Sequence, residues 1–186
     1  DIEPGQPLIA LPVHKDWIGG MVLTPDGRRA VTCSGDQTVQ VTELETGKVI
    51  HTLKGHTSAV YSVAISPDGK TLAAAEVRRK EGKSERRNGM TFTTTLIYGE
   101  VLLCDAQTGA IRAKLNDDDN PAWTIAFSPD GHWLAIDGED SIIRLLDLTG
   151  DDPMRHPIEL IGHAGTVVFH TFSRDSRWLA TGAADH

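Results

Sequence analysis

Short apolar runs separated by polar turns recur along the whole chain, and the clearest turns share one sequence. They read Thr-Pro-Asp-Gly at 24–27, Ser-Pro-Asp-Gly at 66–69 and 128–131, and a degraded Ser-Arg-Asp-Ser at 173–176. In such a turn proline presets φ, aspartate bonds its own backbone and glycine accepts a positive φ. Each turn lies between two apolar runs, so each predicts a hairpin of two antiparallel strands.

The turns also set a period along the chain. Their first residues are 42, 62 and 45 positions apart, and a leucine stands at the same distance before each turn. A period in the forties with strand-turn-strand content is typical of a repeat protein. The predicted organisation is a linker or frayed terminus at 1–6, a strand at 7–11, and one repeat domain over 7–186 with repeats at about 12–53, 54–115, 116–160 and a truncated 161–186.

Each repeat contains up to four predicted strands. The first strand is apolar on both faces, with His170 as the exception, which predicts burial on both sides. No long helical periodicity occurs anywhere, so the fold class is all-β. The second strands are predicted at 29–33, 71–75, 133–136 and 178–181, and the third strands at 38–44, 99–105 and 142–148.

Two insertions interrupt the period. The third repeat gains three residues around 151–153, and the second gains 20 residues between its second and third strands. The second insertion predicts a long hairpin at 77–98, with a turn near Asn88-Gly89. It is either a solvated tip or a contact site for an acidic partner or anionic surface. Six cations against two carboxylates give it a net charge of +4, and they are Arg78, Arg79, Lys80, Lys83, Arg86 and Arg87.

Composition narrows the function classes. The chain has 186 residues, a net charge of −8 and a pI near 5.4, which argues against nucleic acid as a partner. Its apolar runs are too short to span a bilayer, and a cytoplasmic location is favoured. Cys33 and Cys104 lack zinc-site spacing and are predicted to be separate buried thiols. The chain begins at Asp1, so we expect either a removed native start or a fragment.

Several columns of the repeat carry a family resemblance. Gly55-His56, Gly162-His163, the aspartate-glycine turns and Ser34-Gly35-Asp36 resemble the tryptophan–aspartate (WD) repeat family of β-propellers. The resemblance implies four-stranded antiparallel blades, just under four in number. An open arc of a larger propeller is favoured over a compact four-bladed ring or a pair of arcs. The naming tryptophan is missing, and Thr42 stands in its place in the first repeat.

The resemblance also implies a buried histidine, hydroxyl and aspartate network in each blade. The second repeat has Ala74 in the hydroxyl column, and the third has Asp118 and Ile136 in the histidine and hydroxyl columns. We therefore expect the second and third blades to be less regular at that end. The residues assigned to these structural networks are His14, Thr32, Asp36, His56, Asp140, His163, Thr181 and Asp185.

The same networks argue against an enzyme. Threonine, histidine and aspartate recur once per blade, which a structural device explains better than a nucleophilic triad. The acidic loop 116–120 lacks the spacing of a calcium loop, so no metal and no cofactor are predicted. The predicted function is a noncatalytic scaffold that binds proteins or peptides on the propeller rim and hairpin. The alternative is a ligand-binding or hydrolytic propeller that uses Asp117–Asp119 with Asp140. Open blade edges also favour self-association.

Overall fold

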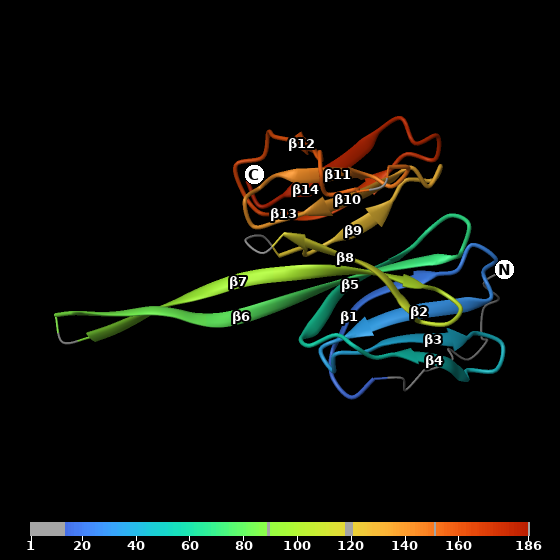
Figure 1. Cartoon of the computed structure of the whole chain (residues 1–186), viewed down its shortest axis with the longest axis horizontal. Coiled ribbons are helices and arrows are strands. Elements are labelled where there is room, and N and C mark those ends of the chain that lie inside the picture. Colours follow the sequence, from blue (N-terminus) through green and yellow to red (C-terminus); the bar gives the residue numbers. More distant parts are fainter. Residues whose placement is uncertain (1–13, 89, 118–120, 151, 186) are drawn as a thin grey trace, which may run out of the picture.

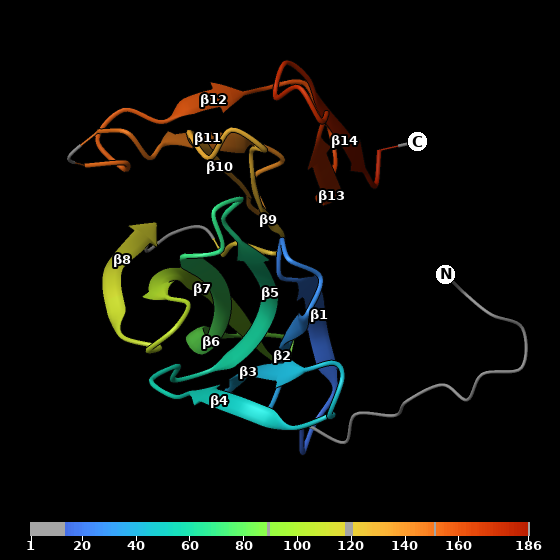
Figure 2. The same ribbon diagram turned by 90° about the vertical axis from the view of Figure 1, so that its right-hand side faces the viewer.

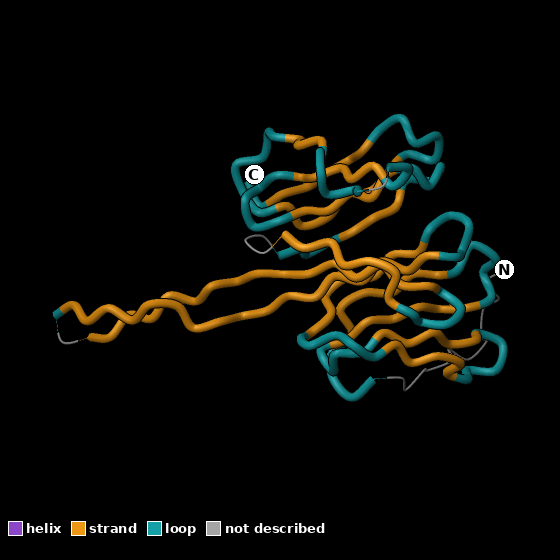
Figure 3. The backbone as a smooth tube through the Cα atoms, in the orientation of Figure 1, coloured by secondary structure: helices purple, strands orange, loops and turns teal. Residues whose placement is uncertain are grey.

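The computed structural model describes residues 14–88, 90–117, 121–150 and 152–185. Within these ranges the chain forms strands and turns and no helix (Figure 3). Fourteen strands make three four-stranded sheets and one two-stranded sheet, each antiparallel and in sequence order (Figure 1). The predicted all-β fold class is confirmed. The strand expected at 7–11 lies outside the described residues.

Each sheet is one blade. The first blade comprises β1 (Ile18–Leu23), β2 (Arg29–Ser34), β3 (Val39–Glu43) and β4 (Val49–Leu53). The second comprises β5 (Ala59–Ile65), β6 (Thr71–Arg87), β7 (Met90–Asp105) and β8 (Ile111–Asp117). The third comprises β9 (Ile125–Phe127), β10 (Trp133–Asp137), β11 (Ile143–Asp147) and β12 (Ile158–Leu160), and the fourth has β13 (Val167–Phe172) and β14 (Leu179–Ala183).

The four aspartate-containing turns join the first two strands of the four blades. In the second blade the Gly69 amide donates to the Ser66 carbonyl at 2.8 Å, and Gly69 has φ of +70°. The degraded fourth turn keeps this geometry, with Ser176 at φ of +59°. A side chain is disfavoured there, so the fourth turn adopts the shared geometry at some conformational cost.

The core lies between the blades. The inner strands β1, β5, β9 and β13 contact one another in that order (Figure 2). One apolar cluster joins the first two blades through residues such as Val31 and Leu72. A second joins the second and third blades through residues such as Val101 and Leu134, and a third joins the last two blades. Blade-to-blade packing therefore holds the arc together.

The two ends of the arc expose apolar side chains. Met21 on β1 is 67% exposed and Trp178 before β14 is 71% exposed. Burial of the first strands on both sides was a wrong prediction for β1 and β13, the first strands of the two end blades. Within the described residues no further blade covers the exposed side chains of β1, and Val168 and Phe169 of β13 are exposed as well. The described blades thus form an open arc of a propeller (Figure 2).

A close backbone approach locks the first blade against the second. A Cβ added to Gly19 would lie 2.6 Å from the Val60 carbonyl oxygen and 2.7 Å from that of Tyr61. We expect Gly19→Ala to lower the free energy of unfolding by about 1–3 kcal/mol, because the two blades must move apart. Urea unfolding measures this effect. Gly162→Ala is the control, since its Cβ would meet nothing within 4 Å, and an equal loss in both variants would contradict the explanation.

The second blade continues into a projecting ribbon. Pairing of β6 with β5 ends at Val77, and pairing of β7 with β8 ends at Gly99. Beyond these residues β6 and β7 pair only with each other, out to the Arg87–Met90 pair, and extend away from the blades (Figure 1). A bulge lies between Glu81 and Ser84. Asn88 has φ of +51°, and Gly89 lies outside the described residues.

Candidate functional site

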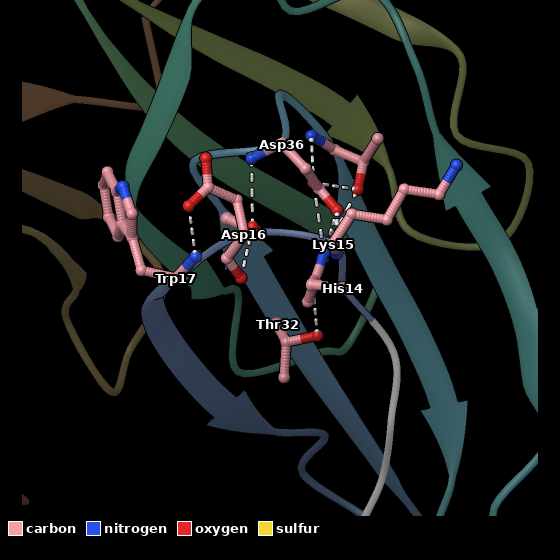
Figure 4. Close-up of polar contacts among 8 residues, drawn as sticks. His14, Lys15, Asp16, Trp17, Thr32 and Asp36 are labelled. Carbon is pink, nitrogen blue, oxygen red and sulfur yellow. Dashed lines mark hydrogen bonds and ion pairs between the residues drawn. The ribbon is translucent and has the colours of Figure 1, made fainter.

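A hydrogen-bonded network lies at the end of β2 in the first blade (Figure 4). His14 Nδ1 lies 3.1 Å from Asp36 Oδ2, and His14 Nε2 lies 2.8 Å from Thr32 Oγ1. The Lys15 amide donates to Asp36 Oδ2 at 2.9 Å. Burial opposes ionisation of Asp36, but donors from Thr38, Lys15 and His14 outweigh it and lower the pKa to about 2. The residues tie the entering loop to β2 and to the turn that follows it.

The fourth blade repeats this arrangement. His163 Nδ1 lies 2.9 Å from Asp185 Oδ2, and His163 Nε2 lies 2.8 Å from Thr181 Oγ1. The Ala164 amide donates to the same Asp185 oxygen at 2.9 Å. Two blades at opposite ends of the arc therefore use the same contacts, which favours a structural role over a single reactive centre.

In the first blade, Thr42 stands at the position of the family's tryptophan. Thr42 is fully buried, and its hydroxyl has no hydrogen-bond partner among the described residues. An unpaired buried hydroxyl costs free energy. The hydrogen-bonded network of the first blade therefore includes His14, Thr32 and Asp36 but does not extend to Thr42 on β3.

The second blade rebuilds the network with a different acid. Glu76 on β6 is 0% exposed, and its Oε2 lies 3.3 Å from His56 Nδ1 and accepts from the Thr57 amide at 3.0 Å. Burial opposes its ionisation, yet bonds from His56, Arg78 and Thr57 lower its pKa to about 2. The expectation of a less regular second blade is wrong, because Glu76 supplies from β6 the carboxylate that the insertion displaces.

Arg78 neutralises two buried carboxylates at the root of the ribbon. Glu76 and Glu100 face each other in the β6–β7 register. Arg78 Nε donates to Glu76 Oε1 at 2.6 Å, and Arg78 Nη2 donates to Glu100 Oε2 at 2.8 Å. Lys114 Nζ lies 3.2 Å from Glu100 Oε1. We call Glu76, Arg78 and Glu100 the root cluster. Arg78 therefore has a structural task that distinguishes it from the other five predicted docking cations.

The third blade uses another buried acid. Asp137 on β10 is 1% exposed and accepts from the Trp123 and Thr124 amides at 3.0 and 2.6 Å. Thr124 Oγ1 lies 3.1 Å from Asp137 Oδ2 and 2.9 Å from Nδ1 of His170, which comes from the fourth blade. Burial raises the pKa of Asp137 to about 6 and lowers that of His170 to about 4. Asp140 instead accepts from Arg144 at 2.6 Å, and Asp118 lies outside the described residues.

The remaining hairpin cations lie farther out along the ribbon. Arg79, Lys80, Lys83 and Arg86 are exposed on β6, and we call these four the ribbon cations. Arg87 occupies the last strand pair, opposite the exposed Met90. Ser84 Oγ lies 2.8 Å from Thr93 Oγ1 across the two strands. The ribbon thus carries positive charge away from the acidic body of the chain.

Other candidate chemistry finds little support in the parts of the chain that the structure describes. Within them no three acidic, histidine or cysteine side chains gather as a metal ion would require. Cys33 and Cys104 are separate buried thiols, and burial raises the pKa of Cys33 to about 12. No helix within the described ranges is long and apolar enough to cross a membrane. Residues 118–120 of the acidic loop lie outside those ranges.

Comparison with known proteins defines the class. The family model "WD domain, G-beta repeat" matches residues 5–42, 47–77, 110–147 and 155–186, so the chain belongs to the WD40 repeat family. It is 28% identical over 157 residues to WD repeat-containing protein SL1-17 of Schistosoma mansoni, covering 73% of this chain and 52% of that protein. It is 32% identical over 141 residues to small ribosomal subunit protein RACK1 of Trypanosoma brucei brucei, covering 75% and 37%.

A solved structure supports the same fold. The structure titled "Structure of U3-55K" matches with a TM-score of 0.64 and 22% identity, over 84% of this chain and 43% of that one. The chain therefore spans about half or less of the length of these relatives. Residues 78–109, which the family model does not match, contain the projecting ribbon.

Proposed function

We propose that this chain is a noncatalytic scaffold whose projecting ribbon docks an acidic surface of a partner protein. The observation that carries the proposal is the separation of two sets of cations on β6. Arg78 is bound within the root cluster, whereas the ribbon cations are exposed beyond the last contact with the blades. A rigid root with exposed charges beyond it suits electrostatic docking.

The competing catalytic reading has weaker support. Histidine–hydroxyl–carboxylate contacts occur in the first and the fourth blades, as a repeated structural element would require. Asp140, one of the acids of the alternative site, accepts from Arg144 and from the Ile142 amide. These contacts favour a local structural role for Asp140.

The proposal predicts that reversing the ribbon cations abolishes partner capture. The variant carries Arg79→Glu, Lys80→Glu, Lys83→Glu and Arg86→Glu, and leaves the root cluster unchanged. We expect it to lose the acidic proteins that the parent chain retains from a lysate of the source organism, as measured by quantitative pull-down. Raising salt from about 0.05 to about 0.3 M should weaken capture by the parent, because exposed charges are screened.

A control variant changes the net charge equally at other exposed sites. It carries Arg28→Glu, Lys48→Glu, Lys54→Glu and Arg177→Glu, and it should keep the partners of the parent. Equal capture by the ribbon variant and the parent would contradict the proposal.

A further inference from the structure

A groove separates the second and third blades at the end opposite to the ribbon. It has a volume of about 600 Å³ and lies beside the turns at 66–69 and 128–131. Leu103 of β7, Phe127 of β9 and Leu148 after β11 line it, and all three are half-buried. The groove therefore offers an apolar floor that is reachable from solvent.

This groove is larger than the groove between the first two blades, and Pro153 lines only the larger one. The corresponding groove between the first two blades measures about 230 Å³. Pro153, which lines the larger groove, belongs to the three extra residues of the third repeat. Departures from a repeat period map to loops, and these loops often form a binding face.

Two carboxylates give the groove a negative rim. The side chains of Asp68 and Asp130 are 57% and 40% exposed. Each Oδ1 accepts from its own turn, in Asp68 from the Ser66 hydroxyl at 2.6 Å and the Lys70 amide at 3.0 Å. The corresponding serine and backbone donors lower the pKa of both groups, so both are ionised near neutral pH. Each Oδ2 also makes a long ion-pair contact of 4.0 Å, to Lys70 or His132.

The one arginine of the lining residues, Arg112, adds a favourable charge interaction with Asp68 but pairs directly with another carboxylate. The Arg112 guanidinium is paired with the Asp105 carboxylate and donates to Thr71 Oγ1 at 3.3 Å. Its charge is already matched by a carboxylate outside the lining. The groove therefore combines an apolar floor with two ionised carboxylates turned towards solvent.

We propose that this groove is a second docking site, for a short extended segment of a partner protein that carries an apolar side chain next to lysine or arginine. The apolar side chain lies on Leu103, Phe127 and Leu148, and the cation lies against Asp68 and Asp130. Apolar anchors in pockets supply most of the affinity of such contacts, and rim charges supply selectivity. The site is independent of the ribbon, which attracts acidic partners.

Fluorescence anisotropy tests the proposal on the full chain with a labelled probe of sequence Gly-Ser-Lys-Arg-Leu-Phe-Lys-Ser-Gly. We expect saturable binding below about 1 mM. The double variant Asp68→Asn with Asp130→Asn should raise Kd at least about five-fold, because two exposed ion pairs are lost while the turn acceptors remain. Asp175→Asn, the same turn position in the fourth blade, should change Kd less than about two-fold.

Two control probes separate the floor from the rim. Replacing Leu-Phe by Ser-Ser in the probe, or its cations by glutamate, should each abolish binding. The proposal is overturned by no binding at about 1 mM, by equal effects of the double variant and Asp175→Asn, or by equal binding of the serine probe. Self-association that the double variant abolishes in the absence of probe would assign the groove to a second copy of the chain, which also overturns it.

Discussion

Replacing Arg78 by methionine is expected to lower the free energy of unfolding by about 3 kcal/mol, because it removes the cation paired with the buried Glu76 carboxylate. Without the guanidinium, Glu76 and Glu100 face each other across β6 and β7, and only Glu100 keeps a lysine partner, Lys114, among the described residues. Like charges directly opposite on paired strands repel. For a chain of this length the loss corresponds to a fall in Tm of roughly 6–12 °C. Urea and thermal unfolding measure it.

The matched control is Arg79→Met, one residue farther along the same strand. Arg79 is exposed, so its replacement should change the free energy of unfolding by less than about 0.5 kcal/mol. Adding Glu100→Gln to the Arg78→Met variant should restore part of the loss, because one of the facing charges is removed. Equal stabilities for the two methionine variants would show that Arg78 is an ordinary surface cation.

The second large effect concerns the pH dependence of the contact between the third and fourth blades. Burial raises the pKa of Asp137 to about 6, so between that value and its unfolded value the folded state binds the extra proton. Asp137 therefore makes the chain less stable as pH rises from about 4 to about 6. Burial lowers the pKa of His170 to about 4, so there the unfolded state binds the extra proton. His170 therefore makes the chain more stable as pH rises across that range.

The effects of Asp137 and His170 on the pH dependence of stability have opposite signs and partly cancel in the parent chain. Replacing one group at a time should therefore reveal each effect. We compare the change in the free energy of unfolding when pH is raised from 4.5 to 6.5. This change should be about 2 kcal/mol less favourable in His170→Asn than in the parent, and about as much more favourable in Asp137→Asn. Urea unfolding at both pH values measures the difference, and acids common to all three chains cancel. Parallel pH profiles for the parent and both variants would refute the assignment of these two groups.

Local chemistry explains what sequence reasoning could predict. The turns at 24–27, 66–69, 128–131 and 173–176 depend on residues within a few positions of one another, and all four form. The ribbon follows from a break in the period together with a β-rich stretch after Asn88-Gly89, and β6 and β7 pair along it. Both features are visible without knowing which blades are neighbours.

Contacts between distant segments explain what sequence reasoning missed. Glu76 stands two positions beyond the hydroxyl column, where the reach of a glutamate side chain brings it to His56. Asp137 meets His170 through Thr124, across two blades. In each case the sequence held a sign of the buried polar group. Glu76 and Glu100 are the lone charged residues of the apolar stretches 71–77 and 99–104, and His170 is the one polar residue in its column. The sequence groups Arg78 with the docking cations because its neighbours share its charge, whereas its partners are Glu76 on the same strand and Glu100 on the next strand.

Removing the ribbon while keeping its root tests directly whether the ribbon binds acidic partners. Residues 79–97 are excised, and Arg78 is joined to Tyr98, its strand partner, by an Asn-Gly turn. The root cluster stays intact, so the free energy of unfolding should remain within about 1 kcal/mol of the parent. Quantitative pull-down from a lysate of the source organism is the measurement. We predict that this folded, ribbonless chain loses the acidic partners of the parent, and retention of all of those acidic partners would contradict the ribbon's role.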